Sequence, residues 1–144
     1  KQIVKYIREN PNDFYQIETN GTIAPSDEML ELVSMGIVKF NCSPKLSSAG
    51  MKIGRTLKPE VLNILDNIPT TIFKFVCSTE DDIKEIESVY LPYISKKKIM
   101  IMPEGISEEA NNKHLQQMID IIIKKGFRIT PRLQTTLFQN RRKT

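Results

Sequence analysis

The sequence predicts an α/β protein in which parallel strands alternate with helices, forming either part of a (β/α) barrel or an open doubly wound sheet. Short apolar segments rich in β-branched and aromatic residues alternate about five times with segments whose apolar residues recur at helical spacing. This alternation is typical of parallel strands joined by right-handed helical crossovers. No strand is followed by the GxGxxG pattern of dinucleotide-binding folds.

The first half of the chain contains three helix patterns and two short strand patterns. Helices are predicted over residues 1–10, from Ser26 and from Pro59, and strands over residues 14–17 and 37–40. Ser26 favours a helix start because its hydroxyl can accept a hydrogen bond from a free backbone N–H. Pro59 suits a first helical turn because it has no N–H to lose there. Residues 46–57 are rich in Ser and Gly and are expected to form a loop.

The second half repeats the same alternation. Strands are predicted over residues 71–76, 98–102 and 127–130, and helices from Ser78 and from Ser107. The helix from Ser107 is expected to end at Gly126, because glycine is the usual residue just past a helix end. Residues 131–134 are expected to form the loop that follows the last strand.

The composition favours one domain of 144 residues with a mild net charge of +4. Cys42 and Cys77 are too few for a disulfide framework, which favours a reduced, cytoplasmic setting. No apolar run reaches membrane-spanning length, and no signal-peptide pattern is found. Basic residues gather at 96–98, 124–125 and 141–143, and both a solvated surface and a contact with an anionic ligand or RNA fit them.

Polar side chains follow the predicted strands, where parallel α/β folds bind their ligands. These strand-end residues are Glu18, Ser43-Pro44-Lys45, Met102-Pro103-Glu104, Arg132 and Gln134. A purely structural turn favours Gly, Asn, Asp or Pro and does not need a carboxylate, a lysine and an arginine at separate strand ends. The set therefore predicts a polar pocket for a small charged ligand.

Simpler interpretations exist for several of these residues. Asn20-Gly21 is an ordinary turn dipeptide, and both Lys45 and Pro103-Glu104-Gly105 are compatible with solvated loops. The only histidine, His114, is interpreted as a surface residue in the middle of a helix. One histidine and two separated cysteines predict neither a catalytic triad nor a metal site within this chain.

Five short motifs, each at or within a predicted strand, resemble the C-terminal part of the 7-carboxy-7-deazaguanine synthase family. They are Glu18-Thr19-Asn20-Gly21-Thr22, Ser43-Pro44-Lys45, Phe73-Lys74-Phe75-Val76, Met102-Pro103-Glu104-Gly105 and Arg132-x-Gln134. Each motif means little alone, but all five occur in the family's order. The resemblance runs from about Tyr15 to Arg142.

The resemblance implies a radical S-adenosylmethionine lyase with an incomplete (β/α) barrel. Such enzymes convert 6-carboxy-5,6,7,8-tetrahydropterin to 7-carboxy-7-deazaguanine on the route to queuosine, using S-adenosylmethionine, a [4Fe–4S] cluster and Mg²⁺. The family also implies a cytoplasmic homodimer and an electron donor such as flavodoxin.

Transferred position by position, the resemblance implies two sets of binding residues. Those expected to contact S-adenosylmethionine are Ser43, Pro44, Lys45, Met102, Pro103 and Glu104, and those expected near the pterin are Glu18, Arg132, Gln134 and Thr144. A carboxylate at Glu18 suits the N–H donors of an aminopyrimidinone, and an arginine can pair with the substrate carboxylate. No catalytic residue and no metal ligand is implied within this chain.

The sequence departs from the family pattern in three ways. It lacks the cluster-binding cysteine motif and the glycine-rich segment after it, it has Gln134 where many members have histidine, and it ends in an unusual basic tail. Residues 1–144 are therefore expected to be one domain, the C-terminal portion of a radical enzyme, that does not catalyse the reaction alone. The alternatives are a non-catalytic relative that binds S-adenosylmethionine or a purine, and a radical enzyme with another substrate. Binding of nucleic acid is disfavoured because the chain lacks interleaved aromatic residues.

Overall fold

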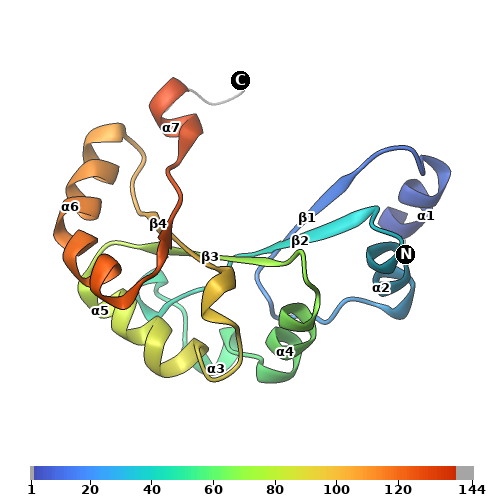
Figure 1. The fold of residues 1–144 in the computed structure, drawn as a ribbon, viewed down its shortest axis with the longest axis horizontal. Coiled ribbons are helices and arrows are strands. Elements are labelled where there is room, and N and C mark those ends of the chain that lie inside the picture. The colour runs from blue at the N-terminus through green and yellow to red at the C-terminus, as the bar shows by residue number, and fades with distance from the viewer. Residues whose placement is uncertain (1, 139–144) are drawn as a thin grey trace.

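The computed structural model describes residues 2–138, apart from the side chains of Gln134, Thr136 and Phe138. Strands and helices alternate along the chain as the sequence predicts (Figure 1). The strands are β1 (Tyr15–Thr19), β2 (Val38–Cys42), β3 (Ile72–Cys77), β4 (Ile99–Pro103) and β5 (Arg128–Ile129). The helices are α1 (Gln2–Glu9), α2 (Asp27–Ser34), α3 (Ile53–Thr56), α4 (Pro59–Asn67), α5 (Glu80–Glu85), α6 (Glu108–Lys125) and α7 (Leu133–Phe138), with short helical segments η1 (Ser47–Ala49), η2 (Ile86–Tyr90) and η3 (Lys96–Lys98).

The five strands form one all-parallel sheet in the order β1-β2-β3-β4-β5. Each crossover therefore steps to the next strand in the same direction, and right-handed crossovers of this kind place every helix on the same face. Figure 1 shows α1, α2, α4, α5 and α6 along the outside of a curved sheet whose other face is open. This arrangement is that of a barrel segment and excludes the doubly wound alternative, in which helices cover both faces.

The burial of the strands shows the same one-sidedness. In β3, Phe73, Phe75 and Cys77 are buried, whereas Ile72, Lys74 and Val76 between them are only partly buried. The register places Lys74 beside Met100 and Val76 beside Met102, so these partly buried side chains share the open face. Apolar burial under the helices is therefore the main source of stability on one face only.

The helix ends follow the predicted signals closely. Ser26 and Ser107 are N-caps whose hydroxyls accept hydrogen bonds from Met29 N and Ala110 N. Pro59 is in the first turn of α4, and Gly126 ends α6 in the left-handed conformation with φ 64°. Ser26, Ser107 and Gly126 each satisfy backbone groups that a helix leaves free at its ends, and Pro59 has no N–H that would need a partner.

Three expectations need correction. Residues 46–57 are not a plain loop, because they contain the short helical turns η1 and α3. The helix predicted from Ser78 is capped by Thr79 and continues from α5 into the π-helical segment η2. Gln134 does not lie in a loop at a strand end but in the first turn of α7, where the chain turns into a helix after Arg132.

Candidate functional site

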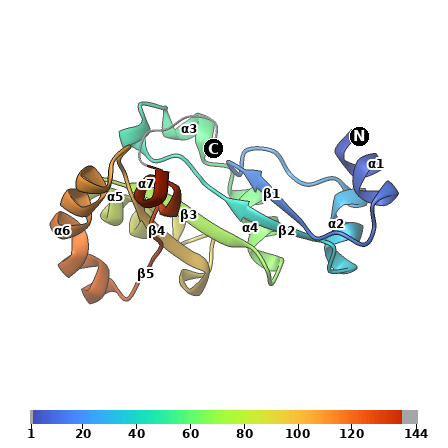
Figure 2. The same cartoon turned by 90° about the horizontal axis from the view of Figure 1, so that it is seen from above.

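A cavity of about 610 Å³ lies at the carboxyl ends of β2, β3 and β4. Its lining includes Pro44 and Lys45 after β2, Ser78 after β3 and Glu104 after β4, together with His114 from α6. Apolar side chains of residues 46–51 and Val76 complete the wall. Figure 2, seen from above, shows the segment with α3 along the edge of the sheet where these strands end. The cavity is therefore in the place where parallel α/β folds bind ligands.

The segment that carries Lys45 is held against η2 and α5. The hydroxyl of Tyr90 donates a hydrogen bond to the backbone carbonyl of Lys45 at 2.8 Å, and the ring of Tyr90 meets that of Phe75 edge to face at 4.9 Å. Burial raises the pKa of Tyr90 to about 12, against the opposing effect of a hydrogen bond with Thr56. The hydroxyl thus stays a donor and fixes the backbone beside Lys45.

A second attachment comes from two carboxylates on α5. Glu85 accepts hydrogen bonds from Ser47 N at 3.0 Å and from the Ser47 hydroxyl. Asp82 is buried and accepts from Ser78 N at 2.7 Å and from Thr79 N at 3.1 Å. Burial acts to raise the pKa of Asp82, but its hydrogen bonds from Ser48, Ser78 and Thr79 together hold that pKa below its ordinary value.

Glu104 and His114 meet at the opposite side of the cavity. Nδ1 of His114 lies 2.8 Å from the backbone oxygen of Glu104 and 3.5 Å from its carboxylate. The side chain of His114 is 25% exposed in α6, so it is partly covered, and it lines the cavity, which the sequence does not predict. Its neighbours in the sequence are polar, and nothing in their spacing reveals that α6 turns this residue back towards β4.

Arg132 also contacts the loop that follows β4. Its Nη1 donates to the backbone oxygen of Gly105 at 2.8 Å. Its Nε and the side-chain oxygen of Asn111 are buried without a hydrogen-bond partner among the described atoms. Arg132 is not part of the cavity lining, but it reaches the loop that carries Glu104. The side chain of Gln134, and Thr144, lie outside the described residues.

Glu18 lies apart from this cavity. Its carboxylate is exposed on β1 and accepts hydrogen bonds from Asn41 at 2.9 Å and from Gln16 at 2.7 Å. It borders a separate hollow of about 250 Å³ beside β1. The structure therefore brings Lys45 and Glu104 to one cavity and leaves Glu18 in β1, three strand positions from β4, after which Glu104 lies.

Three of the residues predicted to contact S-adenosylmethionine do not line the cavity. Ser43 N donates to Thr19 O at 2.7 Å, which joins the ends of β1 and β2. Met102 is partly buried on the open face beside Val76, and Pro103 is buried within β4. Ser43, Met102 and Pro103 stay predictions for direct contact with a ligand.

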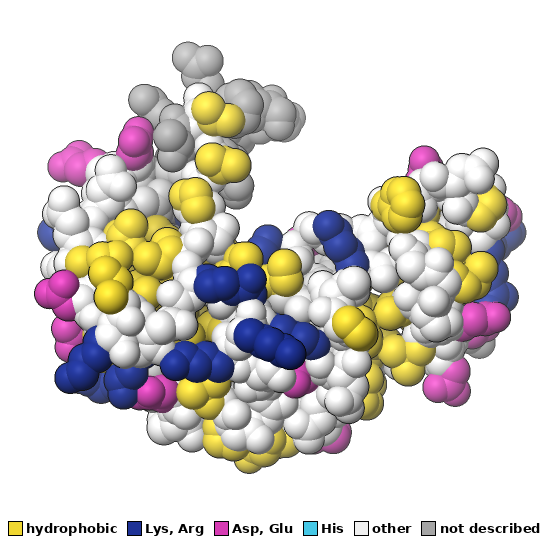
Figure 3. All heavy atoms as spheres, in the orientation of Figure 1, with side chains coloured by type: hydrophobic (Ala, Val, Ile, Leu, Met, Phe, Trp, Pro, Cys, Tyr) yellow, Lys and Arg dark blue, Asp and Glu magenta, His cyan; other side chains and the backbone are white. Residues whose placement is uncertain are grey.

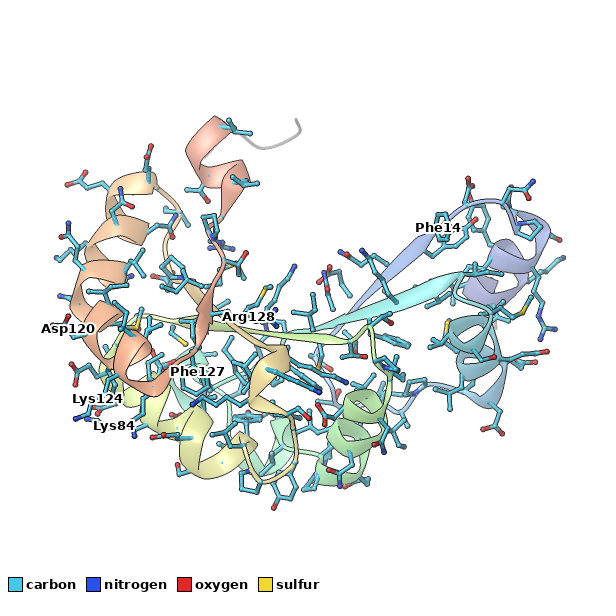
Figure 4. All side chains as sticks on the ribbon, viewed as in Figure 1. Phe14, Lys84, Asp120, Lys124, Phe127 and Arg128 are labelled. Carbon is cyan, nitrogen blue, oxygen red and sulfur yellow. The ribbon has the colours of Figure 1, made fainter. Side chains whose placement is uncertain are left out.

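The basic clusters gather around the amino ends of β4 and β5, away from the cavity. Figure 3 shows Lys and Arg side chains over this part of the molecule, and Figure 4 shows Lys84 and Lys124 pointing outward from the helices near Phe127 and Arg128. Lys96 lies 5.3 Å above the ring of Phe127, and Lys125 pairs with Glu87 at 2.7 Å. The cluster at 141–143 lies outside the described residues.

Residues 2–138 show neither a metal-binding cluster nor a membrane-spanning helix. No group of three or more His, Cys, Asp or Glu side chains there is arranged to hold a metal ion. No helix in this part of the chain has the length and apolarity needed to cross a bilayer. Cys42 and Cys77 are buried and free.

Two curated proteins match the chain over most of its length. Both carry the name 7-carboxy-7-deazaguanine synthase. The protein of Pyrobaculum aerophilum is 33% identical over 128 residues, which cover 88% of this chain and 53% of that protein. The resemblance to 7-carboxy-7-deazaguanine synthases is confirmed. The synthase of Halobacterium salinarum is 27% identical over 146 residues, which cover 86% of this chain and 54% of that protein.

The chain spans about half the length of these two synthases. No protein-family model and no solved structure matches it. The two matches cover most of the residues that form the five-stranded barrel segment of this chain.

Proposed function

We propose that this chain is the part of a 7-carboxy-7-deazaguanine synthase that binds S-adenosylmethionine and the pterin substrate. The observation that carries the proposal is the shared cavity of Lys45 and Glu104. These residues belong to the two motifs from which the resemblance implies contact with S-adenosylmethionine, and the fold brings them together from two strands. The similarity to two proteins with this name supports the substrate and the reaction.

The chemistry of the cavity fits S-adenosylmethionine. Its amino-acid end carries a carboxylate and an ammonium group, which Lys45 and Glu104 match in charge. Its adenosine part needs an apolar wall with a few hydrogen-bonding groups, and Pro44, Leu46 and Val76 stand beside Ser48 and Ser78. The bound cofactor supplies radical chemistry when a reduced iron–sulfur cluster stands beside it. This chain's own residues bind and orient it.

For the pterin we propose two separate contacts, because Arg132 follows β5 and Glu18 lies in β1, at opposite edges of the sheet. Arg132 offers a cation for the substrate carboxylate, and its Nη1 is already oriented by Gly105 O. Glu18 offers a carboxylate for the N–H groups of the pterin edge. We also propose the cytoplasmic homodimer, the Mg²⁺ ion and the flavodoxin-like electron donor that accompany this family.

Binding of S-adenosylmethionine to the chain tests the cavity. We expect Lys45→Ala to weaken binding about tenfold, because a charge-assisted hydrogen bond contributes roughly 1.5–3 kcal/mol when well formed and less when partly solvated. Isothermal titration calorimetry on the chain measures this. Lys113→Ala is the matched control, since Lys113 is exposed on α6 and does not line the cavity. Equal affinity of the Lys45→Ala variant and the unsubstituted chain would contradict the proposed site.

The reaction itself is tested with the full-length protein, reconstituted under anaerobic conditions and supplied with 6-carboxy-5,6,7,8-tetrahydropterin. Formation of 7-carboxy-7-deazaguanine, followed by mass spectrometry, is the expected result. Binding of S-adenosylmethionine without turnover would instead identify a non-catalytic relative. Turnover of another substrate would identify a related radical enzyme.

A further inference from the structure

His114 has a fixed ring orientation at the edge of the cavity. Helix α6 begins at the end of the loop after β4, and the ring of His114 points back to that loop. Nδ1 lies 2.8 Å from the backbone oxygen of Glu104. A carbonyl oxygen can only accept a hydrogen bond, so Nδ1 must carry a proton in this arrangement.

The bond at Nδ1 decides what the other ring nitrogen can do. When one nitrogen of a neutral imidazole donates, the other is an acceptor. The carboxylate of Glu104 also lies on the Nδ1 side, at 3.5 Å. Among the described residues the ring makes one hydrogen bond, through Nδ1, and His114 lines the cavity, so Nε2 is available to a ligand bound there.

We propose that His114 recognises the adenosine part of S-adenosylmethionine through Nε2, which accepts a hydrogen bond from a neutral N–H or O–H donor. The inference rests on the proposed function and adds a specificity-determining residue to it. The carboxylate and ammonium groups of the cofactor's amino-acid end are matched in charge by Lys45 and Glu104, and its sulfonium has no hydrogen to donate. The donors that remain are the exocyclic amine of adenine and the ribose hydroxyls, and both suit a neutral acceptor.

Two substitutions separate this recognition from a merely structural role. In His114→Asn the side-chain amide can replace Nδ1 as the donor to Glu104 but leaves nothing at Nε2. In His114→Gln the side-chain oxygen can reach the place of Nε2. We expect His114→Asn to bind S-adenosylmethionine about three- to tenfold more weakly, the effect of one lost hydrogen bond, and His114→Gln to stay within about twofold of the unsubstituted chain.

The atom of the ligand is identified with analogues of S-adenosylhomocysteine in the same titrations. One analogue carries hypoxanthine in place of adenine and so lacks the amine, and the other lacks the two ribose hydroxyls. The unsubstituted chain should discriminate against one of them, and His114→Asn should lose that discrimination. Thermal unfolding of each variant controls for folding, and the analogue comparison on the unsubstituted chain needs no variant at all.

The outcomes distinguish this inference from the function on which it rests. If the unsubstituted chain binds S-adenosylmethionine, and His114→Asn binds it equally well with unchanged discrimination, only the role of His114 is refuted. Equal affinity of the unsubstituted chain for S-adenosylhomocysteine and both of its analogues would refute that role as well. If the unsubstituted chain binds none of these ligands, the proposed cavity fails together with this inference.

Discussion

Gly105, just after β4, packs closely against the first turn of α6 at the edge of the cavity. Gly105 follows Glu104 with a φ of 142°, a conformation that residues with a side chain rarely adopt. A Cβ atom there would lie 2.9 Å from the Cβ of Ala110 and 3.0 Å from the backbone nitrogen of Asn111. The close approach lets the first turn of α6 sit against the loop, which brings His114 back to Glu104.

Replacement of Gly105 by alanine should therefore be costly. We expect Gly105→Ala to lower the free energy of unfolding by about 2–4 kcal/mol, the sum of backbone strain and a steric clash. Urea denaturation followed by circular dichroism measures this.

The control for this prediction is Gly50→Ala. Gly50 also has a positive φ, 75°, but nothing lies within 4 Å of an added Cβ. It should cost about 1 kcal/mol, the strain alone. Equal decreases in the free energy of unfolding at Gly105 and Gly50 would show that the close contact of Gly105 with α6 adds nothing to the cost.

At the scale of elements, α5 and η2 act as the support of the segment that carries Lys45. The helix widens into a π-helical turn, in which Leu91 N donates to Ile86 O at 3.0 Å, and Tyr90 within this turn bonds to Lys45 O. Glu85 holds Ser47 from the preceding turn. Such π-helical turns are frequent at functional sites because they reposition the side chains that follow.

Asp82 links this support to the end of β3, and its effect should depend on pH. Its pKa is lowered from 3.8 in the folded chain, so its stabilisation is present above that value and is lost as the pH falls through the lower folded-state pKa. We expect Asp82→Asn to cost about 1–2 kcal/mol at neutral pH, as the loss of a helix cap does. The difference from the unsubstituted chain should shrink below about pH 4.

Urea denaturation at a series of pH values measures this difference. Asp81→Asn is the matched control, because Asp81 precedes Asp82 in α5 but its side chain is 86% exposed and pairs only with Lys84. A difference between the Asp82→Asn variant and the unsubstituted chain that is constant from pH 7 to pH 3 would contradict the lowered pKa.

At the scale of the whole molecule, the sheet is stabilised mainly from one side. Helices bury its convex face, and the open face carries partly buried side chains such as Lys74 and Met100. The segment before β1 is exposed as well, because Phe14 there is 89% accessible to solvent (Figure 4). The concave face of this barrel segment is therefore its least covered surface.

Neighbouring residues of β4 should therefore contribute differently to the free energy of unfolding. We expect Ile101→Ala to lower the free energy of unfolding by about 3–4 kcal/mol, because Ile101 is fully buried under the helices. Met100→Ala, on the open face, should cost roughly 1 kcal/mol or less because that side chain already contacts solvent. Chemical denaturation of both variants measures the contrast. Similar losses would show that the open face is covered in solution.

The alternation of strands and helices and most helix ends were predictable from the sequence. Ser26, Pro59, Ser107 and Gly126 act through backbone groups only a few residues away, so their effect can be read locally. The short motifs at Lys45 and Glu104 were likewise recognisable, because their residues are contiguous. The π-helical turn escaped prediction because it depends on what Tyr90 contacts.

Which of these residues share a cavity depends on the arrangement of the strands in the folded chain. The sequential strand order selected the barrel segment over the doubly wound sheet, and no local pattern encodes strand order. The fold joined Lys45, Glu104 and His114, placed Arg132 behind Gly105, and left Glu18 apart. The physical reason is that a shared cavity depends on crossovers and packing between distant segments, whereas helix caps and turns depend on neighbours along the chain.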